Sequence, residues 1–180
     1  MRTTATLTRS DIENAVTPEY VRLSGVLRIA LVSGVTLFYL VIIVLSSQGI
    51  LADDDAADIS GVNILSMIHG VATLGAVAVA VMLSRRMLQK ERLNGSDLPS
   101  VIDQALQLYR TSSILLIAPI EGAALFGGVV ILMATQSGLL ESHPVYWINA
   151  LSAVLLLLVG LLTFPTRERI VDALVEAFGR

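Results

Sequence analysis

The sequence predicts an all-α integral membrane protein, a four-helix bundle made of two tandem hairpins, and three observations lead to this fold class. Of the 180 residues, 54% are hydrophobic and only 15% are charged, whereas about one-quarter of the residues in a soluble domain are charged. Four apolar stretches are each long enough to cross a hydrocarbon core of about 30 Å as a helix. These stretches also contain an internal repeat.

The N-terminal segment, residues 1–24, is largely polar, and we expect it to lie in the cytoplasm. A long polar stretch ahead of the first apolar run is the wrong arrangement for a cleaved signal peptide. Thr17 followed by Pro18 favours a helix that starts at Pro18, because a capping residue precedes proline at the first helical position. The first span, residues 26–47, is predicted to continue this helix and to be retained.

The membrane bundle is predicted to occupy residues 25–165, and a separate C-terminal helix follows it. The second, third and fourth spans cover residues 62–83, 111–135 and 145–164, and a helix after Pro99 leads into the third span. In residues 166–180 the apolar side chains share one helical face; they are Ile170, Val171, Leu174, Ala177 and Phe178. We expect this cytoplasmic amphipathic helix to lie on the membrane surface or to bind a partner.

The distribution of charge predicts the orientation, since Lys and Arg are retained on the cytoplasmic side of spans. All twelve basic residues precede or begin the first span, lie between the second and third spans, or follow the fourth. The opposite side carries only acidic charge, at Asp53, Asp54, Asp55, Asp58 and Glu141. Both termini are therefore predicted to be cytoplasmic.

An internal repeat aligns the first span with the third when the chain is shifted by 88 residues. The matched pairs are Gly34 with Gly122, Leu37 with Leu125, Phe38 with Phe126, Val41 with Val129, Ile43 with Ile131, Gln48 with Gln136 and Leu51 with Leu139. This pattern predicts two hairpins in the same orientation, a parallel repeat. Chance similarity between apolar helices is the alternative.

Glu121 and His69 are the ionisable side chains that we place deep in the spans, where such residues are functional candidates by default. At 1.5 Å per residue, Glu121 lies ~16 Å from the cytoplasmic start of the third span, and His69 lies ~11 Å from the outer start of the second. In a core of about 30 Å these depths nearly coincide. We therefore expect the two side chains to be close enough to hydrogen-bond.

Glu121 is the candidate site for a proton or a cation, with His69 as its neighbour and Ser33 opposite it through the repeat. Pro119 is expected to kink the helix one turn before the carboxylate, because proline removes a backbone hydrogen bond. In the alternative interpretation, Glu121 stays protonated and only joins helices by a hydrogen bond.

Cofactor and metal sites have weaker candidates. His69 has the small neighbours that axial ligation of a haem or a chlorophyll magnesium needs, although a plain hydrogen bond between helices is the alternative. The acidic run at Asp53, Asp54, Asp55 and Asp58 lacks the spacing of a calcium-binding EF-hand loop, so we expect a solvated loop and no metal site. Tyr146 and Trp147 are interpreted as part of the outer aromatic belt.

Several function classes are excluded by what the sequence lacks. The chain has no cysteine and a net charge of −3, and it contains no nucleophile–base pair, phosphate-binding loop or basic patch for nucleic acid. We expect that the protein is not an enzyme. Its predicted partners are the lipid bilayer and other membrane subunits or copies of itself.

The run from Ile120 to Val130 resembles the carboxylate helix of the proteolipid c subunits of rotary ATPases. In that family a mid-membrane Glu or Asp is followed by small residues, an aromatic residue and a glycine. Glu121 matches the ion-carrying carboxylate, Phe126 the aromatic residue and Gly127 the glycine. The four-span layout also resembles that of bacterial membrane proteins without an assigned function, which implies a bacterial cytoplasmic (inner) membrane.

Together these features predict a small proteolipid-like membrane subunit whose mid-membrane carboxylate binds or relays a proton or cation. One alternative is an accessory or scaffold subunit of a larger membrane complex that performs no chemistry. Another is a subunit that binds haem or chlorophyll through His69.

Overall fold

The computed structural model describes residues 7–47, 59–89, 93 and 97–179, and these residues are almost entirely helical. The elements are α1 (Arg9–Ala15), α2 (Pro18–Ser47), α3 (Ile59–Met87), α4 (Leu98–Gln136), α5 (Leu139–Ser142), the 3₁₀ helix η2 (Pro144–Ala150), α6 (Leu151–Leu162) and α7 (Arg167–Phe178). The described residues contain no strand beyond one isolated bridge between Leu7 and Gly179. The predicted all-α class is confirmed.

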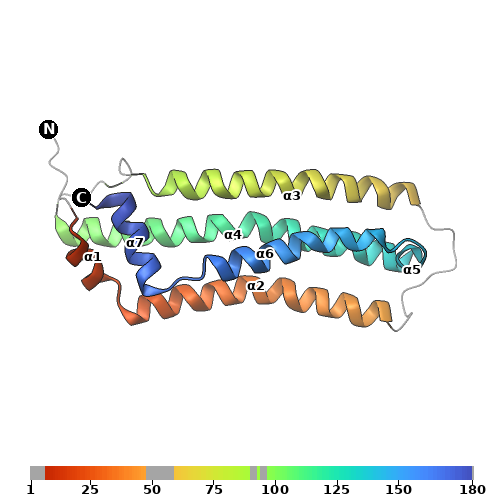
Figure 1. Cartoon of the computed structure of the whole chain (residues 1–180), viewed down its shortest axis with the longest axis horizontal. Coiled ribbons are helices and arrows are strands. Elements are labelled where there is room, and N and C mark those ends of the chain that lie inside the picture. The colour runs from red at the N-terminus through yellow and green to blue at the C-terminus, as the bar shows by residue number, and fades with distance from the viewer. Residues whose placement is uncertain (1–6, 48–58, 90–92, 94–96, 180) are drawn as a thin grey trace.

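Four helical segments of the described chain are long and apolar enough to cross a membrane: α2, α3, α4 and the continuous η2–α6 segment, Pro144–Leu162. They lie side by side along the long axis of the molecule, and both termini lie at one end (Figure 1). Helices α2 and α4 run away from that end, whereas α3 and α6 run back toward it. The predicted membrane bundle is therefore present.

The helix boundaries follow the sequence signals. Helix α2 begins at Pro18, and the backbone N–H of Tyr20 donates to the Thr17 hydroxyl over 3.2 Å, as expected for a side-chain cap. Helix α4 runs unbroken from Leu98 through Pro119 to Gln136, so the helix at Pro99 and the third predicted span are one element. The fourth span ends before Pro165.

Two hydrophobic clusters hold the molecule together, and α4 belongs to both. The membrane core lies between the four long helices and includes Val35, Ile42, Ile117, Val130 and Leu156. The terminal core lies at the end with the termini and comprises Leu7, Ile12, Val16, Val101, Ala105, Ile170, Val171, Leu174 and Phe178. Helix α4 is thus the central element of the fold.

The amphipathic face of α7 is covered by the chain itself. Ile170 and Leu174 are fully buried, and they pack against residues of α1 and of the first turns of α4. Arg9 on α1 also pairs with Asp172 on the exposed side of α7. The expectation that this apolar face meets the membrane surface or a partner is therefore wrong, because α1 and α4 supply a complementary apolar surface.

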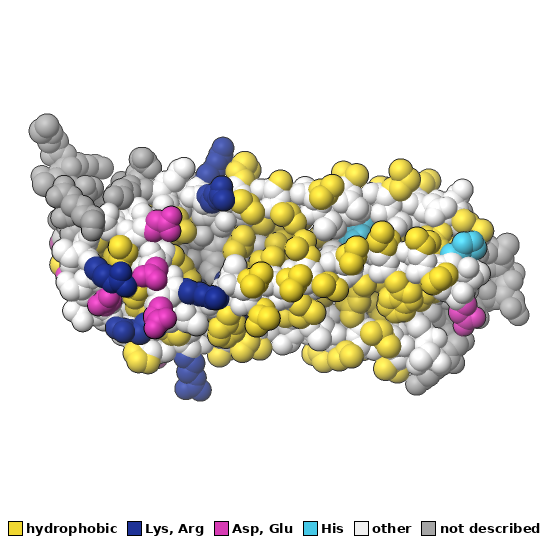
Figure 2. All heavy atoms as spheres, viewed as in Figure 1, with side chains coloured by type: hydrophobic (Ala, Val, Ile, Leu, Met, Phe, Trp, Pro, Cys, Tyr) yellow, Lys and Arg dark blue, Asp and Glu magenta, His cyan; other side chains and the backbone are white. Residues whose placement is uncertain are grey.

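Charged side chains gather at the end that holds the termini, and the middle of the visible face is mostly hydrophobic (Figure 2). The described arginines all lie in this half of the bundle; they are Arg9, Arg22, Arg28, Arg85, Arg86, Arg110, Arg167 and Arg169. The acidic run from Asp53 to Asp58 lies outside the described residues.

Contacts between α2 and α4 occur close to the register of the sequence repeat. The Tyr39 hydroxyl donates to the Ala124 carbonyl, a separation of 85 residues, and Ser46 meets Thr135, a separation of 89 residues. These separations bracket the 88-residue shift that aligns the two spans. Matched positions of the repeat therefore lie at similar heights in the bundle.

Candidate functional site

His69 on α3 is 4% exposed and lies among polar groups of α4, η2 and α6. Its Nδ1 atom is 2.8 Å from Asn149 Oδ1, and its Nε2 atom is 3.1 Å from both the Ala123 carbonyl and the Ser152 hydroxyl. A neutral imidazole with its proton on Nδ1 donates to Asn149 and accepts from a hydroxyl at Nε2. The ring is also packed edge-on against Phe126. The polar groups of His69 are thus satisfied within the bundle.

Asn149 connects this histidine to the remaining helices. It is 1% exposed, and its amide nitrogen donates to the Tyr146 carbonyl over 2.9 Å and to the Ser66 hydroxyl over 3.0 Å. The Tyr39 hydroxyl of α2 lies 3.4 Å from the Asn149 carbonyl. We call the set Tyr39, Ser66, His69, Asn149 and Ser152 the His69 network. Because the Tyr39 hydroxyl donates to the Ala124 carbonyl and His69 contacts the Ala123 carbonyl, the network also reaches α4 and joins all four membrane segments.

Gly127 makes room for this network. A Cβ atom at this position would lie 2.7 Å from His69 Nε2 and 2.9 Å from the Ser152 hydroxyl, and it would also collide with the Asn149 carbonyl. Real Cβ atoms do not approach that closely, so α4 can meet α3 and α6 here only through glycine. In this fold Gly127, which matched the glycine of the c-subunit motif, serves helix packing.

Tyr146 of η2 forms a second, partly buried polar contact, with Asn63 of α3. Tyr146 is 4% exposed, and its hydroxyl donates to Asn63 Oδ1 over 2.9 Å. The assignment of Tyr146 to the outer aromatic belt is therefore wrong, because its ring is inside the bundle. Trp147, the other predicted member of the belt, is 38% exposed.

Glu121 lies at nearly the same depth as His69 but on another side of α4. Its side chain is half-buried, and it forms no hydrogen bond or ion pair with any described residue. The contact of His69 with α4 is made by Ala123, which points about 200° around the helix from Glu121. The expected Glu121–His69 hydrogen bond is absent, because matching depth does not fix the direction in which a side chain points.

Ser33 and Pro119, the other predicted site residues, do not extend a site around Glu121. Ser33 lines a groove between α2 and α6 together with Leu157 and Gly160, and among the described residues no hydrogen bond joins it to Glu121. Pro119 lies inside α4, and the helix continues on both sides of it. The structure therefore separates the residues that the sequence grouped.

A haem or chlorophyll does not fit His69 in this arrangement. A groove of about 560 Å³ between α3 and α6 has His69, Gly70, Asn149 and Ser152 in its lining. Both ring nitrogens, however, already contact protein groups, and an axial bond needs one nitrogen free. Within the described ranges, no three His, Asp or Glu side chains gather as a metal site.

Arg28 is a buried polar residue that the sequence reasoning placed among the cytoplasmic charges. It is 5% exposed, its Nη1 donates to the Thr163 hydroxyl, and its Nη2 donates to the Ser113 hydroxyl. No carboxylate of the described residues pairs with it. Its position two residues inside the first apolar stretch was the available signal for its burial.

Comparison of the chain with protein-family models, curated proteins and solved structures finds no match. The fold and these sites together define a membrane-embedded four-helix protein with three polar features: the closed His69 network, the unpaired carboxyl of Glu121 and the buried guanidinium of Arg28.

Proposed function

We propose that the chain is a membrane subunit that carries a proton or a cation on Glu121, within an assembly of copies or of other subunits. One observation carries this proposal: the carboxyl group of Glu121 lies within a membrane-spanning helix and has no partner among the described residues. An unpaired carboxylate in hydrocarbon is unfavourable by several kcal/mol. The group therefore takes up a proton, binds a cation or meets a polar group of a neighbouring subunit.

The depth and direction of Glu121 support this role. At 1.5 Å per residue, it lies about 12 Å along α4 beyond Ser113, which is at the level of the Arg28 guanidinium. Farther along the helix, Leu125, Val129 and Met133 are 37%, 41% and 38% exposed. Glu121 thus borders a surface of α4 that faces lipid or another subunit, from which a partner has access to the carboxyl group.

The orientation with both termini in the cytoplasm belongs to this proposal. It is supported by the described arginines, which share the half of the bundle with the termini, since basic residues are retained on the cytoplasmic side. In this orientation the terminal core lies on the cytoplasmic side.

Carbodiimide labelling and flux measurements test the proposal on the full-length protein in its native assembly. We expect the carbodiimide to modify Glu121, and we expect Glu121→Gln to abolish both the labelling and proton or sodium flux in proteoliposomes. Glu141→Gln is the matched control, because Glu141 is an exposed carboxylate at the opposite end. Unchanged flux in Glu121→Gln together with an unlabelled Glu121 would contradict the proposal.

A scaffold subunit is the second candidate, and the closed His69 network favours it. That network joins all four spans, and no buried side-chain nitrogen or oxygen of the described residues lacks a partner. In this role, Glu121 donates a hydrogen bond to a neighbouring subunit as a neutral acid. Assembly would then survive Glu121→Gln and fail in Glu121→Leu, because glutamine keeps the hydrogen-bonding group. Chemical crosslinking of the native complex distinguishes these outcomes.

A further inference from the structure

The Arg28 guanidinium is a fixed positive charge in a site without a compensating negative charge. It is 5% exposed, and its two described partners, Thr163 and Ser113, are neutral hydroxyl groups. Burying a charge is costly unless it is paired, and arginine stays protonated in proteins. Two hydroxyl contacts also leave N–H donors of the guanidinium available, since the group has five. The site is therefore electrostatically incomplete without an anion.

A groove between α2 and α6 leads to this guanidinium. It has a volume of about 320 Å³, and its lining includes Arg28, Val32, Ser33, Leu157, Gly160 and Phe164. We call it the inner groove. Apart from Arg28 and Ser33 its lining is apolar, so a small soluble anion would find few hydrogen-bonding groups there. The lining suits a molecule that has an anionic head and a hydrocarbon tail.

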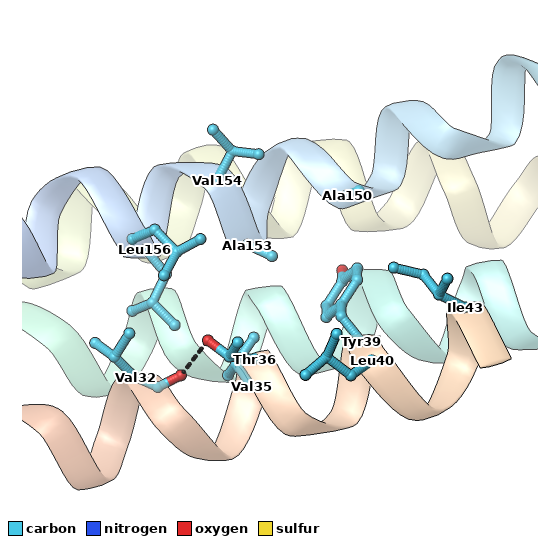
Figure 3. Close-up of a pocket in the computed structure, with 11 residues that line it drawn as sticks. Val32, Val35, Thr36, Tyr39, Leu40, Ile43, Ala150, Ala153, Val154 and Leu156 are labelled. Atoms are coloured by element: carbon cyan, nitrogen blue, oxygen red, sulfur yellow. Dashed lines mark hydrogen bonds between the residues drawn. The ribbon is translucent and has the colours of Figure 1, made fainter.

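A second groove continues along the same pair of helices. This outer groove has a volume of about 230 Å³ and shares Val32 and Leu157 with the inner groove. Figure 3 shows Ala153 and Leu156 of α6 facing α2 across it, with the Thr36 hydroxyl turned back to the Val32 carbonyl. Because the Thr36 hydroxyl already forms a hydrogen bond within α2, the outer groove offers apolar surface to a bound molecule.

The position of Arg28 along α2 matches the boundary between headgroups and hydrocarbon. At 1.5 Å per residue, Arg28 lies about 28 Å from Ser47 at the far end of α2, and the hydrocarbon core is about 30 Å thick. Thr163, one of its hydroxyl partners, directly follows the last residue of α6. A lipid phosphate lies at this depth, and its acyl chain points in the direction of the outer groove.

We propose that the groove between α2 and α6 binds an anionic phospholipid, with the phosphate on Arg28 and an acyl chain in the two grooves. Charge complementarity favours an anionic headgroup, because the lipid phosphate supplies the missing negative charge and forms a charge-assisted hydrogen bond with the arginine. The apolar lining of the two grooves favours a hydrocarbon tail. This site is separate from Glu121 and does not depend on the function proposed for that residue.

Native mass spectrometry of the full-length protein in detergent tests the site with three probes: phosphatidylglycerol, phosphatidylcholine and inorganic phosphate. We expect bound phosphatidylglycerol on the wild-type protein and about tenfold weaker affinity in Arg28→Gln, since a charged hydrogen bond is worth at least that factor. Arg22→Gln is the matched control, because Arg22 is an exposed arginine of the same helix. It should bind phosphatidylglycerol like the wild type.

A second variant keeps the test decisive if Arg28→Gln does not fold. Ser33→Leu leaves the guanidinium in place and fills the inner groove, so it should lose phosphatidylglycerol. Equal binding of phosphatidylcholine and phosphatidylglycerol would overturn the proposal, as would unchanged phosphatidylglycerol binding in either Arg28→Gln or Ser33→Leu. Inorganic phosphate that binds to the wild type as tightly as the lipid would assign the site to a soluble anion and overturn the lipid assignment.

Discussion

His69 and Arg28 are both buried between helices, yet their surroundings differ in kind. His69 has a protein partner at each ring nitrogen, and those partners are themselves hydrogen-bonded. Arg28 carries a permanent charge and hydrogen-bonds only to neutral hydroxyl groups among the described residues. The comparison teaches that burial alone does not identify a binding site. A closed neutral network stabilises packing, whereas a buried charge without an opposite charge calls for a ligand.

The largest expected effect comes from closing the space that the His69 network needs. Gly127→Ala places a methyl group where His69 and Ser152 already lie, and overpacking of this kind costs about 1–3 kcal/mol. Gly122→Ala on the same helix is the control, because its Cβ atom meets nothing within 4 Å. Thermal unfolding in detergent should separate the two variants. Equal midpoints would contradict the tight approach of α4 to α3 and α6.

Removal of the two buried side chains should differ in lipid dependence. His69→Leu removes the hydrogen bond between the imidazole and Asn149 Oδ1, which keeps its contact with the Ser66 hydroxyl, and the loss of a buried hydrogen bond costs about 0.5–1.5 kcal/mol whatever the lipid. Arg28→Gln should lower the thermal midpoint only when phosphatidylglycerol is present, since that lipid supplies the counter-charge. Midpoints measured in phosphatidylcholine and phosphatidylglycerol nanodiscs test this contrast. If Arg28→Gln lowered the thermal midpoint equally in both lipids, the predicted difference between Arg28 and His69 would be wrong.

Glu121 should affect the stability of the isolated chain much less than either buried residue. Because its carboxyl group has no described partner, Glu121→Gln should change the free energy of unfolding by no more than about 0.5 kcal/mol. Chemical unfolding of the detergent-solubilised chain measures this value. A larger loss of unfolding free energy would show that Glu121 forms a stabilising contact within the chain, as His69 does.

The smallest expected effect concerns Asp11, an exposed charge in the capping box of α1. The backbone N–H and the hydroxyl of Thr8 donate to its carboxylate, and these bonds lower the pKa of Asp11. The stabilisation of α1 is therefore present above the unfolded-state pKa of about 3.9. It is lost as the pH falls through the lower folded-state pKa. Amide hydrogen exchange in α1 between pH 2 and pH 6, in steps of about one unit, should show this loss in the wild type and not in Asp11→Asn.

The membrane spans could be predicted because the mean hydropathy of a segment depends only on its own residues. A segment that crosses lipid needs apolar side chains whichever helices pack beside it. The pair Thr17–Pro18 predicted the start of α2, Pro99 predicted the helix that leads into the third span, and residue counting placed Glu121 and His69 at similar depths. Depth along a helix follows from counting residues. Those predictions therefore needed no knowledge of how the helices pack.

The site could not be predicted as well, because it depends on the rotation of each helix about its own axis. Nothing in the sequence indicated that Asn149 would meet His69. The burial of Tyr146 and of the apolar face of α7 likewise depends on which elements happen to cover them. Ser33 points to the groove beside α6 for the same reason.

Helix α4 is shared by the terminal core and the membrane core, and this gives it a mechanical role. At 1.5 Å per residue its 39 residues form a rod of about 58 Å. A partner that twists α7 must twist the first turns of α4 with it or break the terminal core. Pro119 lacks a backbone donor, so one hydrogen bond of the rod is missing at that turn. Torque applied at the end that holds the termini would thus reach a weakened turn two residues before Glu121.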